Sequence, residues 1–192
     1  MSLSAGRSWK EITRESYDNR AEEFASFASI YRGKMQRWIE YFSTQIPKNA
    51  LILDMGCGAG RDALYFATKG FSITGIDFSE RLIEIAKKKV KTGKFLVMDF
   101  EKLSFPKSSF DGIWANASLV HVHRKNLLEL LRKINLVLKR RGLFFSTYRV
   151  GEGERFTEEK RGNAILERFY VYYEPQELEV LLGKAGFSNI EF

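Results

Sequence analysis

The residues whose types and spacing could do chemistry begin with a glycine-rich turn at Asp54–Arg61 (DMGCGAGR). It follows a short apolar run at Ala50–Asp54 and opens a predicted helix at Ala59–Lys69. Glycine allows a tight turn and lets a ligand approach the backbone closely, so we expect a nucleotide-type ligand here. The third glycine of a dinucleotide fingerprint would fall at Arg61, and the Gly-Lys-Ser/Thr of a phosphate-binding loop is absent. Acidic Asp54 would repel a diphosphate but attract an amino group, which indicates a nucleoside with a positive tail.

Carboxylates also end the next two predicted strands. Asp77 follows the glycine turn at the distance where a carboxylate can accept both ribose hydroxyl protons. Asp99 ends the third strand within reach of a purine, with Phe78 and Phe100 as apolar neighbours for the faces of that ring. Because the carboxyl ends of parallel strands meet at one edge of a sheet, we expect these acids and the glycine turn to form one site.

Strands and helices must alternate to position these residues. After a helical region at 9–45, the expected strands are Ala50–Asp54, Phe71–Ile76, Phe95–Met98, Phe110–Ala115, Leu143–Tyr148 and one starting within Phe187–Phe192. The expected helices between them are Ala59–Lys69, Glu80–Lys89, Lys125–Leu138 and Pro175–Lys184. Such alternation predicts an α/β fold, a doubly wound, mostly parallel Rossmann-like sheet with helices on both faces.

From Tyr17 to its end, the chain resembles the class I S-adenosylmethionine-dependent methyltransferases. The family's glycine motif matches 54–60, its ribose-binding acid matches Asp77, and its adenine-contacting acid matches Asp99. The stretch 110–122 is similar to the strand and loop that border the methionine end of the cofactor. Within the class, the chain is most similar to small-molecule methyltransferases of bacteria and archaea.

The resemblance implies S-adenosyl-L-methionine as the cofactor. The residues that would bind it are Tyr17, Asp54, Gly56, Cys57, Gly58, Ala59, Gly60, Arg61, Asp77, Phe78, Asp99, Phe100, Ala115 and Asn116. Tyr17 would cover the cofactor or serve as a core aromatic, and Arg61 would reach the methionine carboxylate. Asn116 stands where amino-methylating members carry Asn-Pro-Pro-Tyr, but Ala117 and Ser118 follow it here, which weakens the case for a nucleobase or amide acceptor.

Candidates for the acceptor side are fewer. His121 lies just past the strand where the methyl group should emerge, and it could act as a general base near neutral pH or merely pack there. Tyr148 and Arg149, at the end of the fifth expected strand, face the expected crevice and could meet an anionic substrate. Two histidines and one cysteine make a poor zinc site, so no metal is expected.

Composition limits the class of protein. The 192 residues are 44% hydrophobic and 29% charged, which is typical of a globular domain. No apolar run approaches the length of a membrane span and the N-terminus has no signal-peptide core, so a cytoplasmic location without membrane contact is expected. The net charge of +7 could attract phosphates, but no aromatic residues interleave with the basic ones, which favours solvated helix faces.

One domain is expected over residues 1–192. It would comprise an N-terminal helical lid (1–46), a cofactor-binding core (50–148), a substrate-side insert (149–174) and a C-terminal helix and strand (175–192). Within the insert, Arg149–Arg168 is rich in Gly and Glu and suggests a mobile lid. The family closes its sheet with two further strands, yet this sequence stops at Phe192, within the sixth; either the chain is cut or Arg168–Glu174 provides a strand elsewhere. A monomer, or a homodimer that covers this edge, is expected.

Together these residues predict an enzyme that transfers a methyl group to an oxygen, nitrogen or sulfur nucleophile of a small molecule. Two alternatives are kept. The net charge would suit a methyltransferase of tRNA or another RNA, whose binding would weaken steeply with salt. A non-catalytic, cofactor-binding regulatory subunit would lack an open acceptor pocket. A dehydrogenase is disfavoured by Arg61 at the third glycine position.

Overall fold

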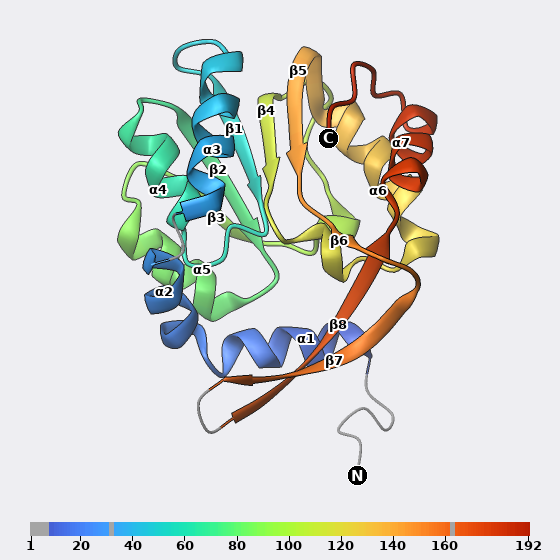
Figure 1. Cartoon of the computed structure of the whole chain (residues 1–192). Coiled ribbons are helices and arrows are strands. Elements are labelled where there is room, and N and C mark those ends of the chain that lie inside the picture. Colours follow the sequence, from blue (N-terminus) through green and yellow to red (C-terminus); the bar gives the residue numbers. More distant parts are fainter. Residues whose placement is uncertain (1–7, 31–32, 162–163) are drawn as a thin grey trace.

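A five-stranded parallel sheet forms the centre of the computed structural model, which describes residues 8–30, 33–161 and 164–192 (Figure 1). The strand order is β3-β2-β1-β4-β5, and every neighbouring pair is parallel. The strands are β1 (Leu51–Met55), β2 (Ser72–Asp77), β3 (Lys94–Val97), β4 (Phe110–Ala115) and β5 (Leu138–Ser146). The order reverses between β1 and β4, which is where ligands bind in open sheets of this kind.

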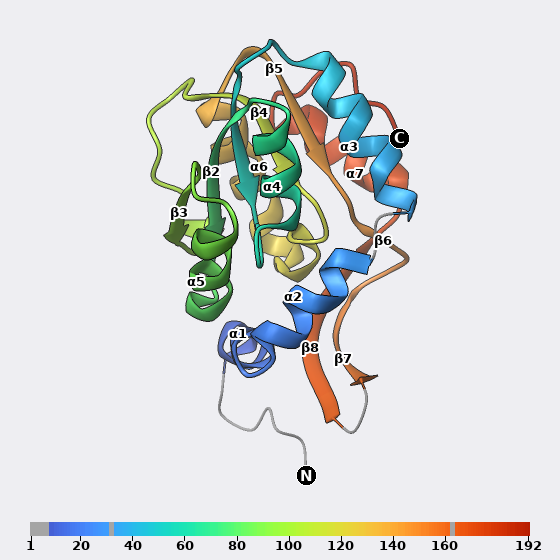
Figure 2. The same ribbon diagram turned by 90° about the vertical axis from the view of Figure 1, so that its left-hand side faces the viewer.

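Helices cover both faces of this sheet because its strands carry apolar side chains on both faces (Figure 2). Along β1, Ile52 packs in the hydrophobic core on one face of the sheet, whereas Leu53 and Met55 pack in the core on the opposite face. The first layer is α3 (Gly33–Gln45), α4 (Arg61–Thr68) and α5 (Glu80–Lys89). The second is α6 (Arg124–Val137) and α7 (Pro175–Lys184). In the described part of the chain, no helix is both long and apolar enough to cross a membrane.

The carboxyl edge of the sheet is covered by segments from the two ends of the sequence (Figure 1). Helix α1 lies along this edge and packs against the long strand β8. The covering elements are α1 (Trp9–Asp18), α2 (Ala21–Ile30), β6 (Arg149–Val150), β7 (Glu154–Arg161) and β8 (Ala164–Tyr173). Two short 3-10 turns, η1 (Phe100–Lys102) and η2 (Leu119–His121), complete the edge.

The predicted doubly wound fold is confirmed, and three local expectations are wrong. The expected mobile lid at Arg149–Arg168 is largely a β-hairpin, because β7 pairs antiparallel with β8 from Glu154 to Val171. No strand forms in 187–192. Strand β5 begins at Leu138, directly after α6, and not at Leu143 as expected. Its pairing with β4 shifts register between Phe110 and Gly112.

The expectation that Arg168–Glu174 provides a strand elsewhere is confirmed, because β8 supplies a strand outside the main sheet. It lies between β6 and β7 in a separate three-stranded sheet. The expected helical region at 9–45 is three helices, and residues 1–7 and 31–32 of the expected lid lie outside the described residues, as do 162–163 of the insert.

Candidate functional site

The glycine turn after β1 requires a left-handed backbone at each of its three glycines. Gly56, Gly58 and Gly60 have φ values of +73°, +51° and +76°. A Cβ atom on Gly56 would lie 2.3 Å from the Cβ of Ser118, so this glycine is needed for packing. A Cβ on Gly58 would meet no described atom within 4 Å, so the turn leaves space beside its backbone at this position. Gly58 is therefore where a ligand can approach the turn most closely.

Asp77, at the end of β2, ties the glycine turn to the next helix. Its two carboxylate oxygens accept the backbone N–H groups of Gly58 and Ser79, each at 2.9 Å. Ser79 caps α5 through Leu82 and donates its hydroxyl proton to Asp18 of α1 at 2.5 Å. Burial raises the pKa of Asp77 to about 6, although the two N–H groups favour its charged form. A carboxylate with two oxygens can accept further hydrogen bonds, as binding to ribose hydroxyls requires.

Asp54 is the second buried acid of this edge. It is only 2% exposed, and its Oδ2 atom has no hydrogen-bond partner among the described residues. Burial, and then the negative charge of Asp62, raise the pKa of Asp54 well above its usual range. An unpartnered buried oxygen is costly unless a ligand satisfies it. Asp54 therefore suits the amino group of the nucleoside with a positive tail that the sequence predicts.

Asp62, which sequence reasoning missed, is the third acid. It accepts hydrogen bonds from Arg61 Nε (2.6 Å) and Nη2 (2.9 Å), from Trp114 Nε1 (2.9 Å) and from Asn116 Nδ2 (3.1 Å). Burial opposes ionisation, but the Arg61 guanidinium and the other two donors hold the pKa of Asp62 below its usual value. The signal that could have indicated Asp62 is an acid in the first turn of a helix, beside an arginine.

Asp99, the predicted adenine-contacting acid, is engaged by the N-terminal helix. Lys10 of α1 lies 2.5 Å from its Oδ2 atom and also pairs with Glu101. The other oxygen of Asp99 accepts the Glu101 N–H at 3.0 Å and so caps η1. Of the two predicted aromatic neighbours, Phe78 is half-buried with its ring 6.1 Å from that of Tyr17, whereas Phe100 is 8% exposed and belongs to the core on the α6 side.

The remaining residues predicted near the cofactor are small or tightly packed. Cys57 is buried, and burial raises the pKa of its thiol well above the usual value, so this thiol stays protonated and inert. Ala59 packs with Ala21 and Leu82, which joins the turn to α2 and α5. Ala115 is fully buried at the end of β4.

At the acceptor end, His121 lies at the centre of a hydrogen-bonded cluster. Its Nδ1 atom lies 2.5 Å from the carbonyl oxygen of Phe169, and its Nε2 atom lies 3.1 Å from the hydroxyl of Tyr17. Because a carbonyl only accepts, Nδ1 carries the proton and the Nε2 of a neutral ring accepts from Tyr17. Arg168 donates to the same hydroxyl at 3.1 Å. The structure thus brings together two predicted residues, Tyr17 and His121, and a third that sequence reasoning missed, Arg168.

The two predicted substrate contacts are adjacent in sequence, with Tyr148 directly before β6 and Arg149 as its first residue. The guanidinium of Arg149 stacks 3.7 Å from the ring centroid of Tyr170, and Tyr170 in turn lies 4.8 Å from His121, so Arg149 borders the same cluster. The ring of Tyr148 packs against Tyr173 instead, and its hydroxyl is buried. Burial raises the pKa of Tyr148 to about 12, so this phenol stays protonated at neutral pH.

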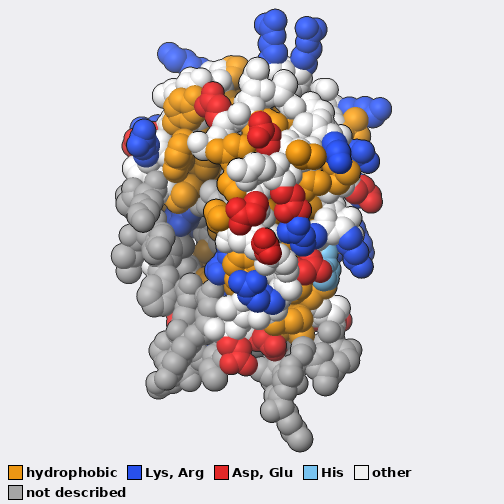
Figure 3. All heavy atoms as spheres, turned by 45° about the vertical axis from the view of Figure 1, so that its right-hand side comes forward, with side chains coloured by type: hydrophobic (Ala, Val, Ile, Leu, Met, Phe, Trp, Pro, Cys, Tyr) orange, Lys and Arg blue, Asp and Glu red, His pale blue; other side chains and the backbone are white. Residues whose placement is uncertain are grey.

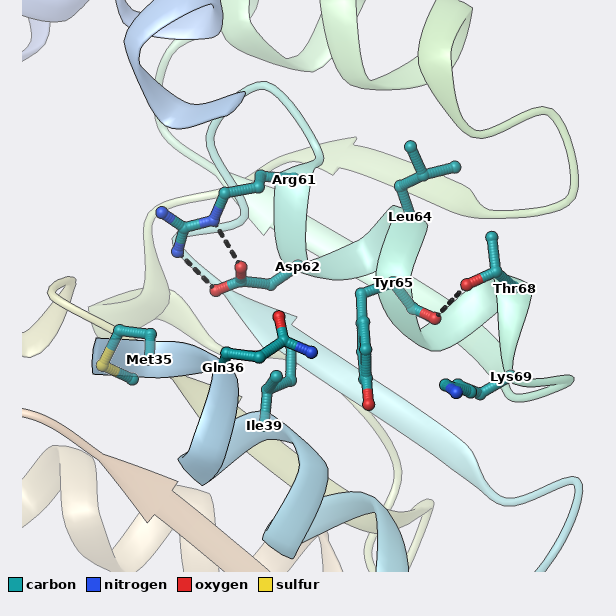
Figure 4. A pocket seen from close by; sticks show the side chains of 9 residues that line it. All are labelled: Met35, Gln36, Ile39, Arg61, Asp62, Leu64, Tyr65, Thr68 and Lys69. Atoms are coloured by element: carbon teal, nitrogen blue, oxygen red, sulfur yellow. Dashed lines mark hydrogen bonds and ion pairs between the residues drawn. The ribbon is translucent and has the colours of Figure 1, made fainter. Parts of the chain in front are cut away.

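A groove of about 330 Å³ opens between α3 and α4, next to the glycine turn (Figure 4). Its inner end is formed by the ion-paired Arg61 and Asp62, which lie opposite Met35 and Gln36 of α3. It continues along α4 toward Lys69. The side chain of Arg61 therefore lies where the groove meets the end of the glycine turn.

Comparisons with known proteins point to one family. A family model described as a methyltransferase domain matches residues 52–142. YqeM of Bacillus subtilis (strain 168) is 29% identical over 143 residues, which cover 67% of this chain and 58% of YqeM. The O-methyltransferase rstn1 of Aspergillus nomiae is 33% identical over 155 residues, which cover 73% of this chain and 65% of that protein. The chain therefore spans less than two thirds of the length of both relatives.

Among solved structures, the chain is similar to the 1,6-didemethyltoxoflavin-N1-methyltransferase of Burkholderia thailandensis. The TM-score is 0.75 at 22% sequence identity, and the match covers 100% of this chain and 83% of the other. That enzyme was crystallised with 1,6-didemethyltoxoflavin and S-adenosylhomocysteine. At this identity the likeness establishes the shared fold.

Proposed function

Because this chain belongs to the class I S-adenosylmethionine-dependent methyltransferases, we propose that it binds S-adenosyl-L-methionine and transfers the methyl group to a small molecule. The acceptor atom would be an oxygen, nitrogen or sulfur nucleophile. The observation that carries the proposal is the unpartnered, buried Oδ2 atom of Asp54, on the strand that leads into the glycine turn in which Gly58 leaves open space. The buried oxygen of Asp54 suits the amino group of a ligand, because it still needs a hydrogen-bond donor. The open backbone at Gly58 suits the nucleoside part of the same ligand.

Several residues of the carboxyl edge would hold the cofactor. Asp77 would accept from the ribose hydroxyls, Asp99 would contact the adenine, and Asp54 would accept from the amino group. Asn116 and Arg61, which share Asp62 as a partner, would lie at the methionine end. When bound, the cofactor supplies an electrophilic methyl group on a sulfonium, so positioning of the acceptor provides much of the rate enhancement.

At the acceptor end, this chain supplies a path for a proton. His121 is 5% exposed and both of its ring nitrogens have partners, whereas Tyr17 is half-buried as a residue, so Tyr17 would be the more accessible of the two to an acceptor. An acceptor that gives up a proton would pass it to Tyr17 as the Tyr17 proton moves to His121 Nε2. Helix α1 and the β7–β8 hairpin lie over this edge (Figure 1), and a site that they shield from water would favour a reaction that disperses the sulfonium charge.

An RNA acceptor is the second candidate, and the face of the molecule shown in Figure 3 gives it no support. On the face seen in Figure 3, basic and acidic side chains are interspersed, and no continuous basic surface runs across its described part. A backbone-binding surface for nucleic acid needs clustered positive charge. The name of one structurally similar enzyme, the 1,6-didemethyltoxoflavin-N1-methyltransferase, states a small-molecule acceptor, which favours the first candidate.

The deciding experiment is calorimetric titration of the protein with S-adenosylmethionine, S-adenosylhomocysteine and NADH. We expect binding of the first two with dissociation constants on the order of micromolar and no binding of NADH. Binding of none of the three would overturn the proposed function. Transfer of a radiolabelled methyl group to small acceptors and to RNA at two salt concentrations would then separate the two candidates, because only RNA methylation should fall steeply with salt.

A further inference from the structure

Asp62 joins three elements at the point where the strand order reverses. Arg61 and Asp62 open α4, Trp114 lies on β4, and Asn116 follows β4. The chain of contacts continues to β5, because Thr147 donates its hydroxyl proton to Asn116 Oδ1 at 3.3 Å. Four hydrogen bonds from three side chains thus converge on one carboxylate that is 14% exposed.

We infer that Asp62 is a positioning residue, which holds Arg61 and Asn116 toward the amino-acid end of the bound cofactor. The inference rests on the proposed function and goes beyond it, because Asp62 itself would touch no part of the ligand. Asp62 would raise the affinity of the site for a nucleoside with an amino-acid tail above its affinity for a nucleoside without one.

The charges at this end of the site support the inference. Asp54 and Asp62 are neighbouring buried carboxyls whose pKa values are displaced in opposite directions, because burial dominates at Asp54 whereas Arg61 and two neutral donors outweigh it at Asp62. Asp62 is therefore a fixed negative charge paired with a fixed positive one. That pairing leaves Asp54 as the acceptor for an ammonium group and presents Arg61 beside it for a carboxylate.

The groove between α3 and α4 explains why Arg61 needs to be held. Its long side chain lies at the inner end of this groove, which gives a guanidinium room to turn away from the glycine turn (Figure 4). Two hydrogen bonds to Asp62, through Nε and Nη2, fix the plane of the guanidinium. Ordering this side chain before the ligand arrives lowers the entropic cost of binding.

The test compares two ligands that differ only at the amino-acid end. S-adenosylhomocysteine carries the tail, and 5′-methylthioadenosine keeps the nucleoside and sulfur without it. In the variant Asp62→Asn we expect calorimetric affinity for the first ligand to fall about tenfold, as for the loss of one charge-assisted hydrogen bond, and affinity for the second to stay within about twofold. The matched control is Asp111→Asn, because Asp111 also holds a basic side chain and a backbone N–H, but at the start of β4.

Two further variants keep the inference testable if Asp62→Asn does not fold. Arg61→Gln and Asn116→Ala should each reduce the preference for S-adenosylhomocysteine. If Asp62→Asn folds, its effect should be smaller in the Arg61→Gln background than in the unaltered protein, because only Asn116 is then left for Asp62 to hold. Equal losses for both ligands, or no loss for either, would overturn the inference alone. Failure of the unaltered protein to bind either ligand would overturn the proposed function and this inference with it.

Discussion

The cofactor end and the acceptor end of this site are built in different ways. At the cofactor end, the functional residues follow parallel strands directly, and hydrogen bonds such as that from Gly58 to Asp77 link adjacent strand ends. At the acceptor end, no single element carries the cluster. Tyr17 comes from α1, His121 from η2 and Arg168 from β8, and the bonds between them join residues 104 and 151 positions apart in sequence.

The difference predicts different consequences of mutation. The buried strands fix the cofactor end before any ligand arrives, so substitutions there should act on affinity. The acceptor end exists only when α1 and the hairpin are both docked, for example through Thr13, whose hydroxyl accepts the N–H of Phe169 at 3.2 Å. Because this end is assembled from separate elements and not from neighbouring strands of one sheet, substitutions there should act on turnover.

The largest expected effect is at the cofactor end, in the variant Gly58→Val. The new side chain would fill the space beside the turn, and we expect calorimetric affinity for S-adenosylhomocysteine to fall at least about 100-fold. Holding a non-glycine residue at φ +51° should also cost about 1–3 kcal/mol of stability, measured by urea unfolding.

The matched control is Gly153→Val. Gly153 has a φ of +75° and nothing within 4 Å of its Cβ position, but it lies between β6 and β7, so the variant should lose similar stability and keep its affinity. If both variants lost affinity equally, backbone strain would explain the loss. The claim that substitutions at the cofactor end act specifically on affinity would then be wrong.

At the acceptor end, Tyr17→Phe should lower turnover about 100-fold with little change in affinity for S-adenosylhomocysteine. The phenyl ring keeps the contacts with Phe24 and Phe78, but the hydroxyl between Arg168 and His121 is lost, and proton transfer by a positioned group contributes about 10²-fold or more. The measurement is the rate of methyl transfer to an acceptor identified in the screen.

Tyr65→Phe is the matched control for Tyr17→Phe, because Tyr65 lies on α4 beside the groove, and it should keep full turnover. If Tyr17→Phe lost affinity and turnover in equal proportion, Tyr17 would belong to the cofactor end, as the family resemblance alone implies.

The same comparison explains how much could be predicted from the sequence. The glycine turn, Asp54 and Asp77 were predicted because strand ends and the turn after them are local features, and topology brings strand ends together. Asp62 was missed although it follows Arg61 directly, because its partners Trp114 and Asn116 come from another strand. A carboxylate that holds side chains from distant parts of the chain forms no sequence motif with them, so spacing alone does not indicate it.

The acceptor end was predicted less well. His121 and Tyr17 were each singled out, but nothing in their spacing indicates that they meet. Arg149–Arg168 was expected to be a mobile lid because it is rich in Gly and Glu, yet pairing with the apolar and aromatic strand β8 makes most of it a hairpin. Pairing across 154–171 depends on tertiary contacts that local composition does not record.

A smaller effect is expected from pH at the cofactor end. The pKa of Asp77 is about 6 in the free protein, and ribose hydroxyls donate to its charged form, so affinity for S-adenosylhomocysteine should fall about tenfold for each pH unit below 6. The sign for folding is the reverse. A raised pKa means that the folded protein holds the proton more tightly, so the contribution of this group to stability is lost as pH rises from about 4 to 6.

Calorimetric titrations between pH 5 and 8 test the pH dependence, with Asp77→Asn as the control. The variant should bind more weakly at pH 8 and lose the step near pH 6. A step that persists unchanged in Asp77→Asn would assign the titration to a group other than Asp77.

The smallest effect should come from the contact where the two ends meet. Lys10 of α1 pairs with Asp99, and a cofactor that contacts Asp99 must replace this ion pair. The two side chains are 31% and 25% exposed, so the pair is worth less than about 1 kcal/mol. Lys10→Met should therefore raise affinity for S-adenosylhomocysteine by no more than about threefold, and Lys133→Met, which removes a bond to Glu101 but none to Asp99, should leave it unchanged. If affinity fell in Lys10→Met, the docking of α1 would contribute more to cofactor binding than the release of Asp99 does. The two ends would then be coupled through this helix.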